Sequence, residues 1–370
     1  MELYHVEEGV EKQLQHKADI NNIPLGGALE LLPLCNMDCK MCYVKQTKEE
    51  MHTQGRLLSC EEWLDIARQG VQHGLLFLLL TGGEPLIYPE FKRLYRGLKQ
   101  LGTILSVNTN GTLLDKDWID FFATEGVRRL NITLYGKDDA TYEKLCGNPK
   151  GYTNVMNGCR LLKERNVPFR LTCSVTPDNV DQLEALFSIA RELEVPLDTA
   201  TYMFPASRRG KSSSEQYRLS PTQAAEALIK CYEFANPNID IVSAAKQSLS
   251  KLFLPPICTP KKGFSCHAGH SGFWISWKGD MLPCGIFEEP RISLLENSFL
   301  DCWNYIVNTT QEMNFCNECK TCDKRNVCSV CPASCHTETG STQGCPSYVC
   351  EFTREQITLL EKLIISSNNL

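Results

Sequence analysis

An alternation of short apolar segments with amphipathic ones, running through residues 27–202, constrains the fold more than any other feature of the chain. Its periodicity predicts strands separated by helices, an order that favours a parallel sheet with helices outside. Six such units are too few for a closed eight-stranded barrel, so we expect an α/β fold built on a partial (β/α)6 barrel of the TIM type, with its chemistry at the carboxyl ends of the strands. The predicted strands are 28–34, 75–81, 103–108, 129–134, 169–175 and 197–202, and the predicted helices between them are 60–73, 89–101, 116–125, 151–165 and 180–193.

Three cysteines follow the first predicted strand in the sequence Cys35-Asn-Met-Asp-Cys39-Lys-Met-Cys42. On one loop, thiols with this spacing can converge on one face of a metal cluster. Three thiolates on a cubane of four irons leave the fourth iron open for a substrate or a cofactor. One alternative is a zinc site, whose fourth ligand would come from His52 or Cys60, and another is a disulfide framework.

Composition narrows the class of protein. The chain has 370 residues, enough for two domains, and a formal net charge of −6 with no basic block, so no nucleic-acid partner is expected. No apolar N-terminal stretch resembles a signal peptide, and the longest apolar run, 75–80, is too short to cross a membrane. Twenty cysteines in such a chain favour metal or iron–sulfur ligation over disulfides, in a cytoplasmic protein.

The second predicted strand ends in Thr81-Gly82-Gly83-Glu84-Pro85. The two glycines let the backbone approach a ligand closely, and Glu84 offers a carboxylate suited to an ammonium group. Together with the cysteine motif, this segment resembles the radical S-adenosylmethionine (SAM) enzymes over roughly residues 27–202. The resemblance implies that the three cysteines hold a [4Fe–4S] cluster. It also implies that SAM chelates the open iron through its amino and carboxylate groups.

The same resemblance assigns the contacts to SAM. Gly82, Gly83 and Glu84 are expected to bind its amino group, and the backbone of Tyr43 its adenine. An electron from a flavodoxin- or ferredoxin-type donor would then cleave SAM, and the resulting 5′-deoxyadenosyl radical would abstract hydrogen from the substrate. Further SAM contacts are implied for residues on three successive strands: Ser106, Asn108, Thr133 and Thr172.

A second cysteine-rich region spans 258–350 and holds twelve of the twenty cysteines. A region with short segments and many glycines and prolines needs metal to compensate for a small core. Two zinc sites are one interpretation. Behind a radical SAM core, the array resembles the SPASM domain, which implies two auxiliary [4Fe–4S] clusters. The implied outer ligands are Cys319, Cys322, Cys328 and Cys350, and the implied inner ligands are Cys266, Cys284 and Cys331.

The inner and outer assignments leave choices open. The last spacing of the motif is two residues where the SPASM pattern has three, so Cys335 competes with Cys331 for the inner cluster. Cys345 competes with Cys350 for the outer one. Cys258 is the expected fourth inner ligand. Without it, the inner cluster would have an open iron that could take a substrate thiolate.

The expected organisation is an N-terminal extension (1–26), a radical SAM core (27–235), a linker (236–257), a small SPASM domain (258–350) and a C-terminal helix (351–370). Residues 273–277 are interpreted as part of a hairpin. Six further cysteines lack the spacing of metal ligands and are interpreted as small buried apolar residues. They are Cys60, Cys146, Cys159, Cys173, Cys231 and Cys302.

SPASM-containing enzymes mostly modify peptides and proteins, so the expected reaction is a thioether or carbon–carbon crosslink in a ribosomally made peptide. The N-terminal extension is too short for a leader-binding domain, which makes a separate leader-binding protein an expected partner. A sulfatase-maturase-like reaction is disfavoured because Gly285 stands where those enzymes carry an aspartate base. Peptide epimerisation and a small-molecule radical reaction remain alternatives. A non-catalytic metal scaffold is disfavoured by the intact motifs.

Overall fold

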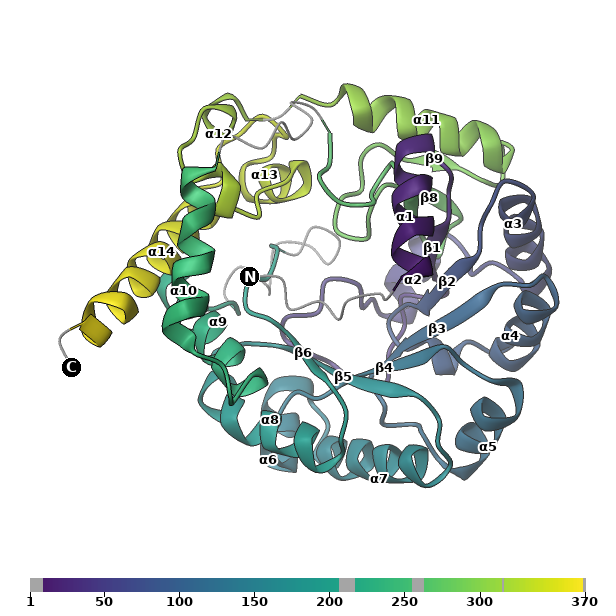
Figure 1. Cartoon of the computed structure of the whole chain (residues 1–370). Helices are drawn as coiled ribbons and strands as arrows, with labels where there is room; N and C mark the ends of the chain where they lie inside the picture. Colours follow the sequence, from purple (N-terminus) through teal and green to yellow (C-terminus); the bar gives the residue numbers. More distant parts are fainter. Residues whose placement is uncertain (1–8, 206–216, 255–262, 315, 369–370) are drawn as a thin grey trace.

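The computed structural model describes residues 9–205, 217–254, 263–314 and 316–368 (Figure 1). Within them, the predicted order of strands and helices is confirmed. The first strand is shorter than expected, because the chain leaves the sheet before Pro33. The six strands of the alternating region are β1 (Gly26–Glu30), β2 (Phe77–Thr81), β3 (Ile104–Thr109), β4 (Arg129–Thr133), β5 (Phe169–Ser174) and β6 (Leu197–Ala200).

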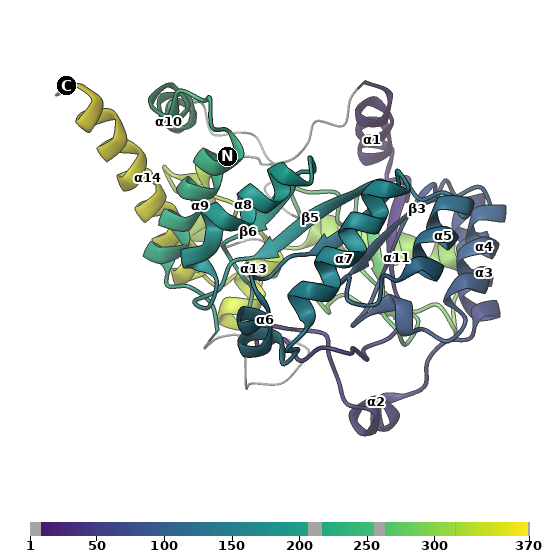
Figure 2. The same cartoon turned by 90° about the horizontal axis from the view of Figure 1, so that it is seen from below.

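Helices cover the outer face of this sheet (Figures 1 and 2). Helix α3 shows why they form: Ser59 and Glu62 make a reciprocal capping box at its start, and Trp63 and Ile66 on one face are buried. Before α9, three helices were not predicted, namely α1, α2 and α6; α1 and α2 lie at opposite ends of the barrel (Figure 2). The helices are α1 (Val10–Asn21), α2 (Lys48–Gln54), α3 (Cys60–Gln72), α4 (Phe91–Gln100), α5 (Lys116–Glu125), α6 (Asp139–Cys146), α7 (Gly151–Glu164) and α8 (Leu183–Glu192).

The sheet continues beyond the six predicted strands. Its order is β6-β5-β4-β3-β2-β1-β7-β8-β9, and β7 (Gly272–Ile275) runs parallel to β1. Strands β8 (Asp280–Leu282) and β9 (Ile292–Ser293) follow antiparallel. The hairpin is therefore confirmed, but it belongs to the same sheet as the barrel. Gly27 permits this pairing, because a Cβ there would lie 2.3 Å from the ring of Phe273.

The two faces of the barrel strands differ in polarity. Leu105, Val107 and Ile132 are buried in the apolar layer between the strands and the outer helices. The residues that alternate with them, including Asn108 and Asn131, are polar and face the interior of the barrel. An interior lined by polar side chains is suited to a ligand rather than to a packed core.

The C-terminal helices lie in two places: α14 packs beside α9 and α10, whereas α11 packs beside α3 and the last strands of the sheet (Figure 1). Helix α10 occupies part of the segment expected to be a linker, and α14 begins at Ser347, so that Cys350 lies in its first turn. None of the helices in the described residues is long and apolar enough to span a membrane. The C-terminal helices are α9 (Pro221–Ala235), α10 (Ile241–Ser250), α11 (Phe299–Glu312), α12 (Asn317–Lys320), α13 (Pro332–Thr339) and α14 (Ser347–Asn368).

Candidate active site and cysteine groups

Backbone hydrogen bonds hold the loop that carries Cys35, Cys39 and Cys42 in place. The amides of Asp38 and Lys40 donate to carbonyls in the last turn of α6, at 2.8 and 3.0 Å. Within the loop, the Cys42 amide donates to the Cys39 carbonyl at 3.0 Å. These bonds use the free carbonyls that every helix presents at its C-terminus. Helix α6 therefore holds the cysteine loop at the carboxyl end of the barrel.

The structure brings the three cysteines of the loop together. Burial raises the pKa of Cys35 to about 12, and the nearby charges of Glu84, Cys39 and Cys42 contribute to the shift. Backbone amides donate to two of the sulfurs. The Met37 amide donates to Cys35 Sγ at 3.4 Å, and the Lys45 amide donates to Cys42 Sγ at 3.3 Å. Metal ligation requires thiolates, and N–H donors at sulfur are a means of tuning an iron–sulfur cluster. The donor set thus fits such a cluster.

Cys146 lies beside this group at the end of α6. Its thiol interacts with Cys39, and this contact together with burial raises the pKa of Cys39 well above the usual value. All six cysteines interpreted as buried apolar residues are indeed buried. Cys146 is thus part of the core and also a neighbour of the predicted ligand Cys39. Its isolated position in the sequence gave no reason to expect this contact.

The two glycines after β2 pack against the chain that leads into the cysteine loop. The Gly83 amide donates to the Leu32 carbonyl at 2.7 Å, and the Glu84 amide donates to the Leu34 carbonyl at 2.9 Å. A Cβ on Gly82 would lie 2.6 Å from the Leu32 oxygen, and one on Gly83 would lie 2.2 Å from the Leu34 oxygen. Close approach of these glycines to a ligand stays a prediction, and the structure shows that they also approach the neighbouring backbone closely.

Glu84 is fully buried and its carboxylate is well supported. Oε1 accepts hydrogen bonds from the Leu86 amide at 3.1 Å and the Thr109 hydroxyl at 2.8 Å, and Oε2 accepts one from the Asn110 amide at 2.7 Å. Burial raises the pKa of Glu84 to about 7, and these hydrogen bonds oppose the shift. A buried carboxylate with this support is suited to receive a cationic group.

The other predicted SAM contacts are spread from the middle of the barrel strands to their carboxyl ends. Tyr43 is half-buried directly after Cys42, and Ser106 lies on β3 on the same side as Asn108. Thr133 and Thr172 are register partners on β4 and β5. Asn110, just beyond β3, reaches furthest toward the cysteines, since its Nδ2 lies 3.7 Å from Cys35 Sγ.

A network of polar side chains that was not predicted crosses the inside of the barrel. Asn131 Nδ2 donates to Asn108 Oδ1 at 2.6 Å, and Arg170 Nε donates to Asn131 Oδ1 at 2.7 Å. Arg170 also pairs with Asp198 Oδ2 at 2.6 Å. The chain of contacts therefore crosses four consecutive strands. The signal for it is the polar residue at every second position of these strands.

Beside the cysteine loop lies a polar cavity of about 250 Å³. Its wall includes Glu30 at the end of β1, Gln46 just after the loop, and residues of the β7–β8 hairpin such as Lys278 and Asp280. The cavity therefore joins the barrel to the C-terminal part of the sheet.

In the C-terminal region, the four predicted outer ligands line one cavity of about 120 Å³. They reach it from α12, the following loop and the first turn of α14. Lys324, Arg325 and Arg354 line the same cavity. Asp323 lies in the same wall and pairs with Lys324 at 2.8 Å, so the cavity gathers four thiols and a net positive charge, which suits an anionic cluster. The four thiols belong to Cys319, Cys322, Cys328 and Cys350.

The predicted inner ligands also lie near one another. Burial raises the pKa of Cys284 to about 11, with contributions from the charges of Cys331 and Cys266. The backbone amide of Ser334 donates to Cys331 Sγ at 3.4 Å. The fourth predicted inner ligand, Cys258, lies outside the described residues.

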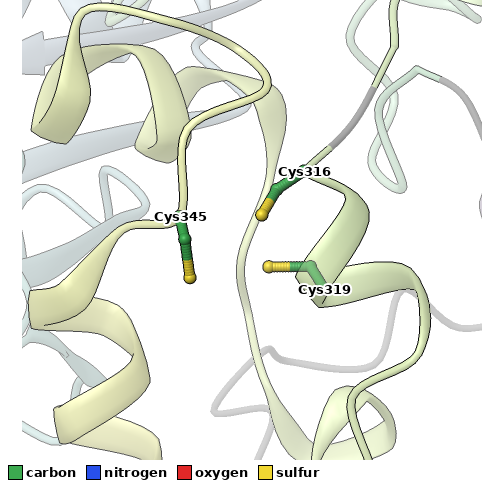
Figure 3. Close-up of side chains that lie close together, drawn as sticks. All are labelled: Cys316, Cys319 and Cys345. Atoms are coloured by element: carbon green, nitrogen blue, oxygen red, sulfur yellow. The ribbon is translucent and has the colours of Figure 1, made fainter.

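Cys316 and Cys345 lie beside Cys319 in a group of three thiols that was not predicted as a site. Their sulfurs and that of Cys319 all lie within 4.8 Å of one another (Figure 3). Cys345 Sγ also lies 3.6 Å from Cys350 Sγ. Cys335 is fully buried in the same small apolar group as Cys316 and Cys319. The CxxC spacing of Cys316 and Cys319 was the signal available in the sequence.

A buried ion pair joins this region to the barrel. Arg218 donates to both oxygens of Glu338 on α13, at 2.6 and 3.0 Å, and both side chains are largely buried. The guanidinium lies 4.0 Å from the ring centre of Tyr348 on α14, and the Tyr202 hydroxyl donates to Glu338 at 2.9 Å. The bidentate geometry and the shared partners fix the C-terminal helices against the end of β6.

Comparison with known proteins places this site in a family. The model of the Radical SAM superfamily matches residues 29–216, just over half of the chain. The chain belongs to the radical SAM superfamily and is an enzyme of that class, and its Cys-rich C-terminal region is consistent with a SPASM domain. The family implies a [4Fe–4S] cluster and SAM, which the cysteine loop and Glu84 fit.

Two curated relatives show sequence similarity over most of the chain. The AdoMet-dependent heme synthase of Methanosarcina barkeri is 24% identical over 351 residues, which cover 87% of this chain and 95% of the relative. The sporulation killing factor maturation protein SkfB of Bacillus subtilis is 24% identical over 288 residues, which cover 75% of this chain and 64% of SkfB.

Solved structures share the fold. Streptococcus suis SuiB bound to S-adenosylmethionine matches with a TM-score of 0.66 at 16% identity, covering 92% of this chain and 81% of SuiB. The structure of anSMEcpe with bound AdoMet matches with a TM-score of 0.67 at 17% identity, covering 94% of this chain and 96% of that protein. The barrel and the C-terminal region are therefore arranged as in proteins of this class.

Proposed function

We propose that the protein is a radical SAM/SPASM enzyme that modifies a peptide, forming a thioether or carbon–carbon crosslink. The observation that carries the radical chemistry is that Cys35 lies among the loop thiols and within the electrostatic influence of the buried carboxylate of Glu84. When bound, the cluster and SAM supply a 5′-deoxyadenosyl radical, which abstracts hydrogen from the substrate. Cys35, Cys39 and Cys42 would hold the cluster, and the Glu84 carboxylate would accept a hydrogen bond from the amino group of SAM.

The proposed SAM contacts beyond Glu84 are those of the sequence analysis. The backbone of Tyr43 would meet the adenine. Gly82 and Gly83 would bind the amino group together with Glu84, and their contact with 32–34 supports this position. The barrel interior would shield the reacting atoms from bulk water. Polar strand residues at its carboxyl end complete the proposed contacts: Ser106, Asn108, Thr133 and Thr172.

Two auxiliary clusters are proposed for the C-terminal region. The shared cavity and its three cations support the outer set, and the mutual proximity of Cys266, Cys284 and Cys331 supports the inner set. Cys258 is proposed as the fourth inner ligand. A crosslink leaves one surplus electron, which such clusters could accept. The outer ligands would be Cys319, Cys322, Cys328 and Cys350.

A peptide substrate is supported by the relatives and by the polar cavity next to the cysteine loop. SkfB is a maturation protein, and SuiB has been solved bound to its precursor peptide SuiA. The cavity could accept a polar side chain of a peptide. A separate leader-binding protein, a flavodoxin- or ferredoxin-type electron donor and a cytoplasmic location complete the proposal.

Formylglycine formation receives less support. An aspartate at position 285 would act as the base in that reaction, and this chain has Gly285. A Cβ there would lie 2.9 Å from the Trp274 ring. Trp274 is in turn fixed by the hydrogen bond from its Nε1 to Glu30 Oε2 at 2.9 Å. The packing of the hairpin thus leaves no space for the base.

A small-molecule reaction is the second candidate function. It is favoured by the heme synthase of Methanosarcina barkeri, which matches this chain over 95% of its own length. The polar interior of the barrel would also suit a substrate with carboxylate groups, since Arg170 lies within it. The choice between the two candidates depends on the substrate that is consumed.

The first experiment tests the radical chemistry. The protein is reconstituted anaerobically with iron and sulfide, and iron content and 5′-deoxyadenosine formation are measured. We expect about twelve irons in the wild type and about eight in the Cys35→Ala/Cys39→Ala/Cys42→Ala variant, with SAM cleavage lost. Cys159→Ala, which removes a buried thiol outside the predicted sets, serves as the control. Zinc alone, or iron that the triple substitution does not change, would contradict the proposal.

The second experiment separates the substrates. The active enzyme is incubated with SAM and either cysteine-containing peptides or a heme precursor, and products are analysed by mass spectrometry. A crosslink removes two hydrogens from the peptide, epimerisation leaves its mass unchanged, and formylglycine replaces a cysteine with an aldehyde. Turnover of the heme precursor with unmodified peptides would replace the first candidate with the second.

A further inference from the structure

The proposed auxiliary clusters leave four cysteines of the C-terminal region outside both ligand sets, namely Cys302, which is buried in the core, and Cys316, Cys335 and Cys345. Two of them meet Cys319 in a compact group. All three ligand sulfurs of Cys316, Cys319 and Cys345 lie within 4.8 Å of one another. The fold, and not the sequence, makes this contact, because Cys345 comes from the segment between α13 and α14 (Figure 3).

The spacing of these sulfurs is that of ligands on a single ion. Four thiolates bind Zn²⁺ in a tetrahedron with Zn–S bonds of about 2.3 Å, so that neighbouring sulfurs lie about 3.8 Å apart. Ligands of a cubane are bound to separate irons and lie further apart. Cys350 lies outside this compact group, but its Sγ is 3.6 Å from Cys345 Sγ, so it is the thiol that would take the fourth position once a metal draws the ligands together.

The surroundings of the group are suited to a soft divalent cation. Cys316 and Cys319 are buried at the start of α12, whereas Cys345 is exposed and gives access from solvent. Thiolate ligands favour Zn²⁺ over harder cations. Binding would release a proton from each neutral thiol. The Glu318 carboxylate lies 3.1 Å from Cys316 Sγ and is placed to accept the first of these protons.

We propose that Cys316, Cys319, Cys345 and Cys350 form a zinc site that excludes the outer iron–sulfur cluster. Cys319 and Cys350 belong to both ligand sets, and their thiolates serve one metal centre at a time. Cys316 and Cys345 complete the zinc site, and Cys322 and Cys328 complete the cluster site. The exclusion rests on the outer-cluster assignment proposed above, whereas the zinc site itself does not.

The zinc site is tested on the full-length metal-free protein, kept anaerobic and without iron or sulfide. Zn²⁺ is titrated and bound metal is counted, and Co²⁺ in parallel reports thiolate ligation by its charge-transfer absorption. We expect about one tightly bound zinc in the wild type. Its affinity should fall at least about tenfold in Cys316→Ser/Cys345→Ser and stay within about twofold in Cys322→Ser/Cys328→Ser. Equal zinc affinity in all three proteins would overturn the site.

A second arm tests the exclusion. Protein loaded with zinc is reconstituted with iron and sulfide, and we expect about four fewer irons than in zinc-free protein. In the Cys316→Ser/Cys345→Ser variant, the same treatment with zinc should not lower the iron content. Equal iron content in loaded and zinc-free wild type would overturn the exclusion. SAM cleavage is measured separately, so that failure of the radical proposal is distinguished from failure of either arm.

Folding of the variants is controlled by circular dichroism and thermal melting. Because Cys345 is exposed, Cys345→Ser alone should preserve the fold while it removes one ligand. A zinc affinity in this single variant equal to that of the wild type would also count against the site, whatever the double variant does.

Discussion

The two cysteine regions of the molecule differ in how their thiols are held. In the barrel, three cysteines share one loop, and backbone hydrogen bonds to α6 and to the Gly82–Gly83 segment fix that loop. In the C-terminal region, the cysteines come from several short segments, and more thiols gather than one cluster needs. A single loop fixes which thiols meet, whereas a surplus of thiols from separate segments permits more than one metal centre.

Attachment of the C-terminal region to the barrel gives the largest expected effect. Glu338→Gln removes the charge that compensates the buried Arg218 guanidinium, so we expect the free energy of unfolding to fall by about 3 kcal/mol. Urea denaturation followed by circular dichroism measures it. Glu351→Gln, an exposed acid on α14, is the control and should change it by less than about 0.5 kcal/mol. Equal stability of the two variants would mean that the ion pair does not hold the regions together.

In the barrel, Glu84→Gln should weaken SAM binding. The substitution keeps the side-chain shape but removes the charged acceptor of the hydrogen bond from the SAM amino group, a loss of about 1.5–3 kcal/mol, or about 10- to 100-fold in Kd. Equilibrium dialysis with the reconstituted enzyme measures the affinity. The exposed Glu61→Gln provides the matched control. Unchanged affinity in Glu84→Gln would remove this carboxylate from the site.

Gly83→Ala tests whether the close backbone contact positions the cysteine loop. The Cβ of the alanine would lie 2.2 Å from the Leu34 oxygen. We therefore expect the free energy of unfolding to fall by about 1–3 kcal/mol and the iron content after reconstitution to fall as well. Gly26→Ala is the control, because a Cβ there meets only the Phe77 oxygen at 3.9 Å. Thermal melting and iron content give the two readings. Normal iron content in Gly83→Ala would show that the loop does not need this contact.

The smallest expected effect is a pH dependence at Glu84. Burial raises the pKa of this carboxyl from 4.5 to about 7, so the folded protein holds its proton more tightly than the unfolded chain. The contribution of Glu84 to stability is therefore full below about pH 4.5 and is lost as the pH rises through about 7. SAM affinity should change in the opposite direction, because only the ionised carboxylate offers a charged acceptor to the amino group of SAM.

The two trends can be separated by experiment. SAM affinity should fall by up to about tenfold per pH unit below about pH 7, and this slope should disappear in Glu84→Gln. Urea denaturation of the SAM-free protein between pH 5 and pH 8 should show the opposite trend, again absent from the variant. An affinity that falls with rising pH in the wild type would contradict the assignment.

The sequence alone determined the parts of this protein that depend on local pattern. The strand and helix periodicity predicted the six parallel strands of the barrel. The spacing within 35–42 and the segment 81–85 predicted the SAM end of the barrel, because each motif lies on one short stretch of chain. The same pattern held a signal that was not used, the polar residues at every second position that form the Asn108–Asn131–Arg170 network.

Only the tertiary structure decided which distant segments meet. The pairing of β7 with β1 joins the C-terminal region to the barrel in one sheet, and the approach of Cys345 to Cys316 and Cys319 brings a second ligand set into contact. Neither follows from spacing along the chain, because contacts between remote segments depend on how the elements pack. The loop cysteines were predictable because a short loop limits where its thiols can go. The C-terminal thiols come from separate segments, so their partners were fixed only when the helices and the sheet had packed.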